Sequence, residues 1–273
     1  PLYHWTALEL KRYFGIEGGL STSKAQEIWE RANSQLGQER LSVRGILKEF
    51  NVYAVGTTDD PIDNLEYHRA IRNGTAPIGP IATQVLPSFR PDSALNIEKA
   101  NFPQYIQKLA EVADMPIVDY EGLVQALARR VQFFKEMGCL SSDHGLEYAP
   151  ISKLDKKKAD VVFKMRMKKK QIDKKAEDLF RFNLLVDLAQ VYAQEHIAMQ
   201  IHLSAIRNNN TPLLQALGPD TGFDASHDQS LSQGLSLLLD AMATSGNMPK
   251  IILYSLNPKD YYPLATLVAC HQN

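Results

Sequence analysis

The first fifty residues carry apolar side chains at the spacing of an α-helix. One predicted helix follows a run of serine and threonine residues at 21–23 that can cap it. Its apolar positions are Ala25, Ile28, Trp29 and Ala32. A second helix is predicted over residues 43–50, and no strand pattern precedes residue 51. We therefore predict that residues 1–50 form a helical segment appended to the rest of the chain.

From residue 51 onward, short apolar runs of the kind found in buried strands alternate with helical patterns. The predicted strands cover residues 52–56, 83–89, 139–142, 198–206 and 250–256. The predicted helices cover residues 61–73, 102–113, 120–137, 151–196 and 231–243. Five strand-then-helix units imply parallel strands joined by right-handed crossovers. The pattern predicts an α/β domain over residues 51–273.

Polar residues gather after each predicted strand and before the next helix. In a β/α barrel these positions share one face, where active sites are built. An open, doubly wound sheet places its site at the same strand ends, so periodicity alone does not separate the two folds. No glycine-rich dinucleotide loop occurs in the sequence.

The composition argues against a nucleic-acid-binding, a membrane-spanning or a disulfide-rich protein. The 273 residues carry a formal net charge of -1, which gives no general attraction to nucleic acid or to anionic membranes. No apolar run approaches the roughly 18 to 20 residues that span a bilayer. Cys139 and Cys270 are too few for a disulfide framework, and each adjoins an apolar run. We predict buried free thiols and a reducing cytoplasm.

Residues 153–175 contain eleven lysines and arginines. Such a run is compatible with a nucleic-acid or membrane surface. Aspartates at 155, 160 and 173 interleave with the basic residues, and Phe163 is the one aromatic residue. These features favour a solvated helix face.

Arg90, Asp92 and Asp143 come at the ends of two predicted strands. An arginine there can hold a carboxylate through two parallel hydrogen bonds, and Asp92 can orient it or bind a hydroxyl group. Asp143 can act as a general acid or base. The alternatives are a local ion pair for the first two residues and a helix cap for Asp143.

His202 lies inside the predicted strand 198–206, and alternation places Ser204 on the same face and Ile201 and Leu203 on the other. A lone histidine in an apolar strand is commonly a core residue. Arg207 and three asparagines follow, and this density of donors and acceptors suits a polyol. The alternative is a turn stabilised by asparagine side chains.

Two further residues follow the first predicted strand. Asp60 is predicted to cap a helix that begins at Pro61, and His68 is predicted to lie on the surface of that helix. Metal-binding patterns are absent from the sequence: there is no Cys-x-x-Cys, no His-x-His and no His-Glu-x-x-His.

Several motifs, in order along the chain, resemble those of the uronate (glucuronate) isomerase family. They are the helical stretch 1–12, VGTTDDP (55–61), FRPD (89–92), SDH (142–144), AIRNNN (205–210), LGPDTGFD (217–224) and ILYSLNP (252–258). The resemblance implies the amidohydrolase superfamily, with a (β/α)8 TIM barrel that carries a helical insertion. It implies about five of eight barrel strands here, because the chain reads as a piece of a longer protein.

The resemblance implies interconversion of D-glucuronate with D-fructuronate and of D-galacturonate with D-tagaturonate, by proton transfer between carbons 1 and 2. Arg90 and Arg207 would bind the substrate's carboxylate or hydroxyl groups, and Asp143 would hydrogen-bond the sugar. His202 would contact the reacting end. The family usually has glycine at the position of Ser204.

A zinc site is implied through residues outside this chain, and so is the proton-moving carboxylate. We therefore expect this piece alone to be inactive. Alternatives are a metal-dependent hydrolase of the same superfamily and a non-catalytic module. The partner would be a uronic acid, not nucleic acid or membrane, and a homo-oligomer stays open.

Overall fold

The computed structural model describes residues 2–77 and 79–272, and these divide into two compact units. One unit comprises residues 1–55 and 69–85, and the other comprises residues 56–68 and 86–273. We predicted a helical insertion over residues 1–50 and a barrel portion over 51–273. The first boundary in the structure follows residue 55, five residues after the predicted one. That the first unit is an insertion and the second a portion of a barrel stays a prediction.

The first unit is mainly helical, as the spacing of its apolar residues predicted. Its helices are α1 (Leu2–Phe14), α2 (Ala25–Leu36) and α3 (Val43–Glu49), with short 3-10 turns at Thr22–Lys24 and Glu39–Leu41. Leu10, Ile16 and Ile28 form a small core between α1 and α2. Ser42 caps α3 by accepting a hydrogen bond from the backbone of Gly45.

The second unit is built on a parallel sheet, which confirms the predicted α/β class. The strands of the described residues are β1 (Ala54–Gly56), β2 (Gln84–Leu86), β3 (Ser88–Phe89), β4 (Ser141–Gly145), β5 (Ala198–Leu203), β6 (Ala205–Ile206), β7 (Ala225–Ser226) and β8 (Ile251–Ser255). The order β3-β4-β5-β8 makes the parallel sheet. β1 pairs with β2, and β6 pairs with β7 in antiparallel fashion.

Two predicted strands are each broken in two. Residues 83–89 divide at Pro87, which has no backbone N–H to donate to a ladder. Residues 198–206 divide at Ser204, whose φ of +66° ends the alternation of side chains. The predicted strand 139–142 begins at Ser141 and continues to Gly145, so Asp143 lies within a strand.

Further helices connect the strands. They are α4 (Glu66–Arg72), α5 (Asp92–Leu95), α6 (Phe102–Ala113), α7 (Tyr120–Glu136), α8 (Lys156–Met167), α9 (Lys174–Gln194), α10 (Thr211–Leu217), α11 (Ser232–Thr244) and α12 (Tyr261–Ala269), with a 3-10 turn at Pro258–Asp260. The helical stretch predicted over 151–196 consists of two helices, α8 and α9, because Lys169 takes a left-handed backbone and Asp173 caps a new helix. The helix predicted from Pro61 was wrong, since α4 begins at Glu66.

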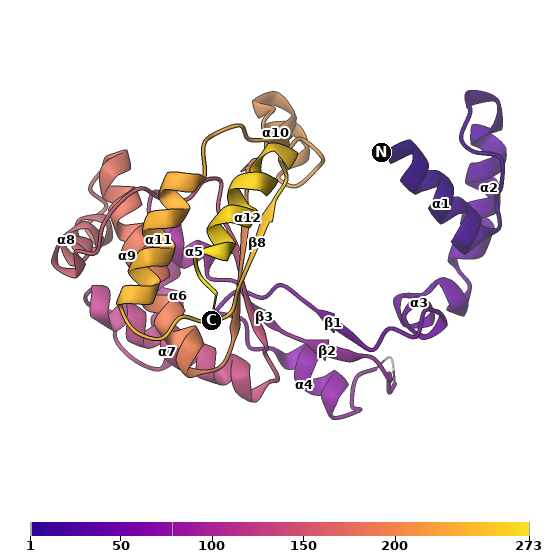
Figure 1. The fold of residues 1–273 in the computed structure, drawn as a ribbon. Coiled ribbons are helices and arrows are strands. Elements are labelled where there is room, and N and C mark those ends of the chain that lie inside the picture. The colour runs from indigo at the N-terminus through magenta and orange to yellow at the C-terminus, as the bar shows by residue number, and fades with distance from the viewer. Residues whose placement is uncertain (1, 78, 273) are drawn as a thin grey trace. The chain divides into compact units, whose positions relative to one another are not determined.

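Helices pack on one face of the parallel sheet. Figure 1 shows α6, α7, α9 and α11 gathered on one side of the parallel sheet, whose outer strands β3 and β8 are labelled. Along β5, Met199, Ile201 and Leu203 are buried in this core, whereas Gln200 and His202 lie on the opposite face, as alternation predicted. The face that carries His202 is therefore the less covered one.

The two cysteines differ in exposure, and the basic run is paired with acidic side chains. Cys139 and Cys270 are free thiols, and Cys139 is buried as predicted, but Cys270 is exposed. In the basic run, several lysines pair with nearby aspartates, for example Lys164 with Asp160. Within residues 2–77 and 79–272, no helix is both long and apolar enough to cross a bilayer.

Candidate active site

Four of the five predicted site residues form one continuous polar network in the second unit. The Arg90 guanidinium donates from Nε to Oδ2 of Asp92 at 2.8 Å and from Nη1 to Oδ2 of Asp143 at 3.0 Å. The other oxygen of Asp143, Oδ1, lies 2.7 Å from Nδ1 of His202. The structure therefore brings together Arg90, Asp92, Asp143 and His202.

The register of the sheet explains this meeting. Gly145 of β4 is paired with His202 of β5, and Asp143 is paired with Gln200. Because paired residues in parallel strands project to the same face, the side chains of Asp143 and His202 share one face. Arg90 follows β3 directly, so it reaches the same strand ends from the neighbouring strand.

The charges of the network keep Arg90 ionised and fixed. Burial alone would lower the pKa of Arg90, but the adjacent Asp92 and Asp143 outweigh it and raise that pKa. Burial raises the pKa of Asp92, and Arg90 opposes this shift. A guanidinium held by two carboxylates has a fixed orientation, so it loses little further entropy when it hydrogen-bonds a ligand.

Asp92 joins two segments of the backbone. Its Oδ1 accepts a hydrogen bond of 3.1 Å from the N–H of Gly145, while Oδ2 accepts from Arg90. A β-carbon placed on Gly145 would lie 2.5 Å from Nη2 of Arg90 and 2.9 Å from Oδ2 of Asp92. Gly145 was missed by sequence reasoning, although a glycine next to a predicted site at a strand end was its signal.

His202 stacks on a residue that sequence reasoning also missed. Its ring lies against that of Tyr254, its paired residue in β8. The Tyr254 hydroxyl donates to Oε1 of Gln200 at 2.9 Å. The His202 side chain remains 43% exposed, so the imidazole is oriented from two sides yet accessible to a ligand. The signal for Tyr254 was its place in the last predicted strand, next to the one that carries His202.

Arg207 has a different partner. Its Nη1 lies 2.6 Å from Oδ2 of Asp224, and the backbone N–H of Asn208 donates to the other oxygen of Asp224. The side chain of Arg207 is half exposed on the segment that follows β6. Its place in the site therefore stays a prediction.

The residues after β1 form a second polar group, which corrects two expectations. His68 is not a surface residue: its side chain is 10% exposed, and Nε2 lies 2.7 Å from the Thr57 hydroxyl. Thr57 also donates to Asp59 at 2.6 Å. Asp60 accepts hydrogen bonds from the hydroxyl groups of Ser93 and Tyr105, and these contacts tie the segment to α5 and α6.

A zinc ion needs three or four nitrogen, sulfur or oxygen ligands from the protein. Across residues 2–77 and 79–272, no three His, Cys, Asp or Glu side chains come close enough to hold a metal ion. In the network, Nδ1 of His202 and Oδ1 of Asp143 face each other. The described residues do not make a zinc site by themselves.

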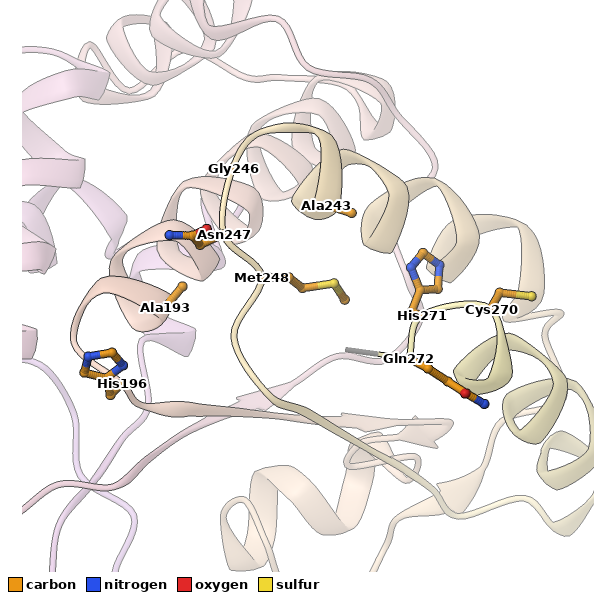
Figure 2. Close-up of a pocket in the computed structure, with 9 residues that line it drawn as sticks. All are labelled: Ala193, His196, Ala243, Gly246, Asn247, Met248, Cys270, His271 and Gln272. Carbon is orange, nitrogen blue, oxygen red and sulfur yellow. The ribbon is translucent and has the colours of Figure 1, made fainter.

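A cavity of about 630 Å³ lies elsewhere in the second unit. Figure 2 shows Met248 between Ala193 and His196 on one side and Cys270 and His271 on the other. Ala193 lies near the end of α9 and His196 just after it, Met248 follows α11, and Cys270 and His271 follow α12. None of the five candidate residues lines this cavity.

Known proteins resemble this chain over its full length. A family model for glucuronate isomerase matches residues 1–273. The uronate isomerase of Brachyspira hyodysenteriae is 46% identical over 272 residues, covering all of this chain and 58% of its own length. That of Caldanaerobacter subterraneus is 44% identical over 273 residues, again with 58% of its length covered. The chain thus spans somewhat more than half of these curated relatives.

Solved structures show the same similarity. The crystal structure of uronate isomerase from Thermotoga maritima aligns with a TM-score of 0.88 and 28% identity, over 99% of this chain and 58% of that one. Glucuronate isomerase from Caulobacter crescentus aligns with a TM-score of 0.81 and 28% identity, over 95% of this chain and 53% of that one. The match of the family model over the full sequence establishes membership: the chain belongs to the glucuronate isomerase family.

Proposed function

We propose that the protein containing this chain is a uronate isomerase. It interconverts D-glucuronate with D-fructuronate and D-galacturonate with D-tagaturonate by moving a proton between carbons 1 and 2. The network of Arg90, Asp143 and His202 at neighbouring strand ends carries this proposal. It joins a fixed cation for a sugar acid to a carboxylate–imidazole pair beside it.

Arg90 binds the anionic or hydroxyl-bearing part of the substrate. Nε and Nη1 are occupied by Asp92 and Asp143, so Nη2, which lies against Gly145, has donors to offer a ligand. Asp92 orients the guanidinium of Arg90 and so contributes to substrate binding indirectly. Arg207 binds a second polar group of the substrate in this proposal.

His202 contacts the reacting end of the sugar, and Asp143 holds its imidazole. A carboxylate 2.7 Å from Nδ1 orients the ring, which suits a group that forms a hydrogen bond with a substrate oxygen. Tyr254 keeps the imidazole plane fixed by stacking. The carboxylate that moves the proton lies outside this chain in our proposal.

A portion of a (β/α)8 barrel is the architecture that fits this sheet best. An open, doubly wound sheet has helices on both faces, whereas a barrel has them on the outer face only. Here the helices pack on the face of Ile201 and Leu203, and the face of His202 and Tyr254 is the less covered one. That second face corresponds to the interior of a barrel whose remaining strands lie outside this chain.

We also propose where a zinc ion would be held and which small molecule the protein binds. We infer that any zinc is held by residues outside this chain, because the described residues do not make a site by themselves. The partner is a small uronic acid. We propose a cytoplasmic location, with which the sparse use of cysteine is consistent.

Product analysis of the full-length protein tests the function. Incubation with D-glucuronate should yield a ketouronate of unchanged mass, whereas a product that has gained water would support a hydrolase instead. Arg90→Lys should lower kcat/KM by about a hundredfold, since lysine lacks the planar fork that contacts two carboxylates and a ligand. The matched control is Arg129→Lys, at an exposed ion pair with Asp114, which should leave kcat/KM unchanged.

A further inference from the structure

The junction between β5 and β6 is made by a buried serine in an unusual conformation. Ser204 has a φ of +66°, in the left-handed region that favours glycine, and its side chain is completely buried. A non-glycine residue persists in such a conformation only when its surroundings hold it there. The contacts of Ser204 show which groups hold it in this conformation.

The hydroxyl group of Ser204 donates to Oδ2 of Asp260 at 2.7 Å. Ser255, the last residue of β8, donates to the same oxygen at 2.5 Å. Asp260 is itself buried, and its carboxylate therefore ties the end of β5 to the end of β8. The backbone carbonyl of Ser204 accepts a further hydrogen bond of 2.8 Å from the N–H of His227.

This junction lies between two predicted site residues. His202 precedes it on β5, which pairs with β8 in the parallel sheet. Arg207 follows it, directly after β6, which leaves the parallel sheet to pair with β7. The backbone angle at residue 204 therefore sets the direction in which the chain carries Arg207 away from His202.

We propose that Ser204 and Asp260 are a pair of positioning residues, in which the buried hydrogen bond holds a strained kink that places Arg207 relative to His202. The inference rests on the proposed uronate isomerase function. Both residues are buried, and in this proposal neither touches the substrate. A left-handed backbone is strained for serine but not for glycine. The hydrogen bond to Asp260 offsets this strain, so serine can occupy the position.

A double-mutant cycle in the full-length protein tests the pair. Ser204→Ala keeps the strain and removes the hydroxyl, so kcat/KM should fall at least tenfold, mainly through KM. Ser204→Gly removes the hydroxyl but adopts the kink freely, so kcat/KM should stay within about threefold of the wild type. Asp260→Asn should lower kcat/KM several-fold with Ser204 present and hardly at all in the Ser204→Gly background.

Ser255→Ala is the matched control, since it removes the other hydroxyl from Asp260 without touching the kink. It should lower the Tm while leaving kcat and KM near the wild-type values. Wild-type kinetics in Ser204→Ala, or an equal effect of Asp260→Asn in both backgrounds, would overturn the proposal. Should the wild-type protein not isomerise uronates, the proposed function fails separately, and non-additive Tm changes at residues 204 and 260 still decide whether the pair holds the kink.

Discussion

The imidazole of His202 lies flat on the phenol ring of Tyr254, with ring centroids 4.5 Å apart and planes 6° from parallel. Stacking of this kind fixes the plane of the imidazole, and it also shields one face of the ring from water. Tyr254→Leu should therefore lower kcat about tenfold by releasing the ring. Tyr254→Phe keeps the stack and loses the bond to Gln200, so steady-state kinetics should show at most a small change. Equal losses in both variants would assign the effect to the hydroxyl instead.

Gly145 leaves the space that Arg90 occupies. A methyl group at residue 145 would lie 2.5 Å from Nη2 of Arg90, well inside van der Waals contact, so Arg90 and Asp92 must move. Gly145→Ala should lower kcat/KM by about a hundredfold while the protein still folds. The control is Gly74→Ala, at a turn where a β-carbon would meet nothing within 4 Å, although its φ of +68° disfavours alanine. That variant should lose some Tm but keep its kinetics, and unchanged kinetics in Gly145→Ala would count against the role of Arg90.

Arg207 is predicted to bind substrate, although its ion pair in the structure is with Asp224. Arg207→Ala should lower kcat/KM at least tenfold, mostly through KM, because a binding cation is lost. Asp224→Asn removes the charge of its partner and leaves the arginine in place, so the effect on KM should be smaller. Near-normal kinetics for Arg207→Ala would remove Arg207 from the site.

His144 should make stability depend on pH. It is completely buried on β4, and Nε2 lies 3.1 Å from the Ser142 hydroxyl. Burial lowers the pKa of His144 from 6.5 to about 3, with the charges of Arg90 and His202 adding to the shift. The unfolded chain therefore takes up this proton first, so the stabilisation is complete above pH 6.5 and is lost as the pH falls toward 3.

The loss from this one group between pH 7 and pH 5 should be about 2 kcal/mol of unfolding free energy. Urea unfolding of the full-length protein at the two pH values measures it. His144→Phe should reduce the difference by about that amount. His4→Gln, at an exposed histidine of α1, should leave it unchanged. An undiminished pH difference in His144→Phe would show that His144 is not the group responsible.

Local sequence predicted the strands of the parallel sheet, most of the longer helices and the grouping of the main candidates. Buried strands and amphipathic helices follow from periodicity, because each side chain's face depends on its own backbone. Asp143 and His202 come together because both lie near the ends of parallel strands, and Arg90 follows the strand beside them. The resemblance of ordered motifs named the family, which the family model confirms.

Only the tertiary structure decided which partner each polar side chain takes. His68 is buried against Thr57, Asp60 binds hydroxyl groups from two helices, and Arg207 pairs with Asp224. Ser204 keeps a left-handed backbone because its hydroxyl meets Asp260, 56 residues further along the chain. Partners so distant are chosen by packing and register across the sheet, and local periodicity carries no information about either.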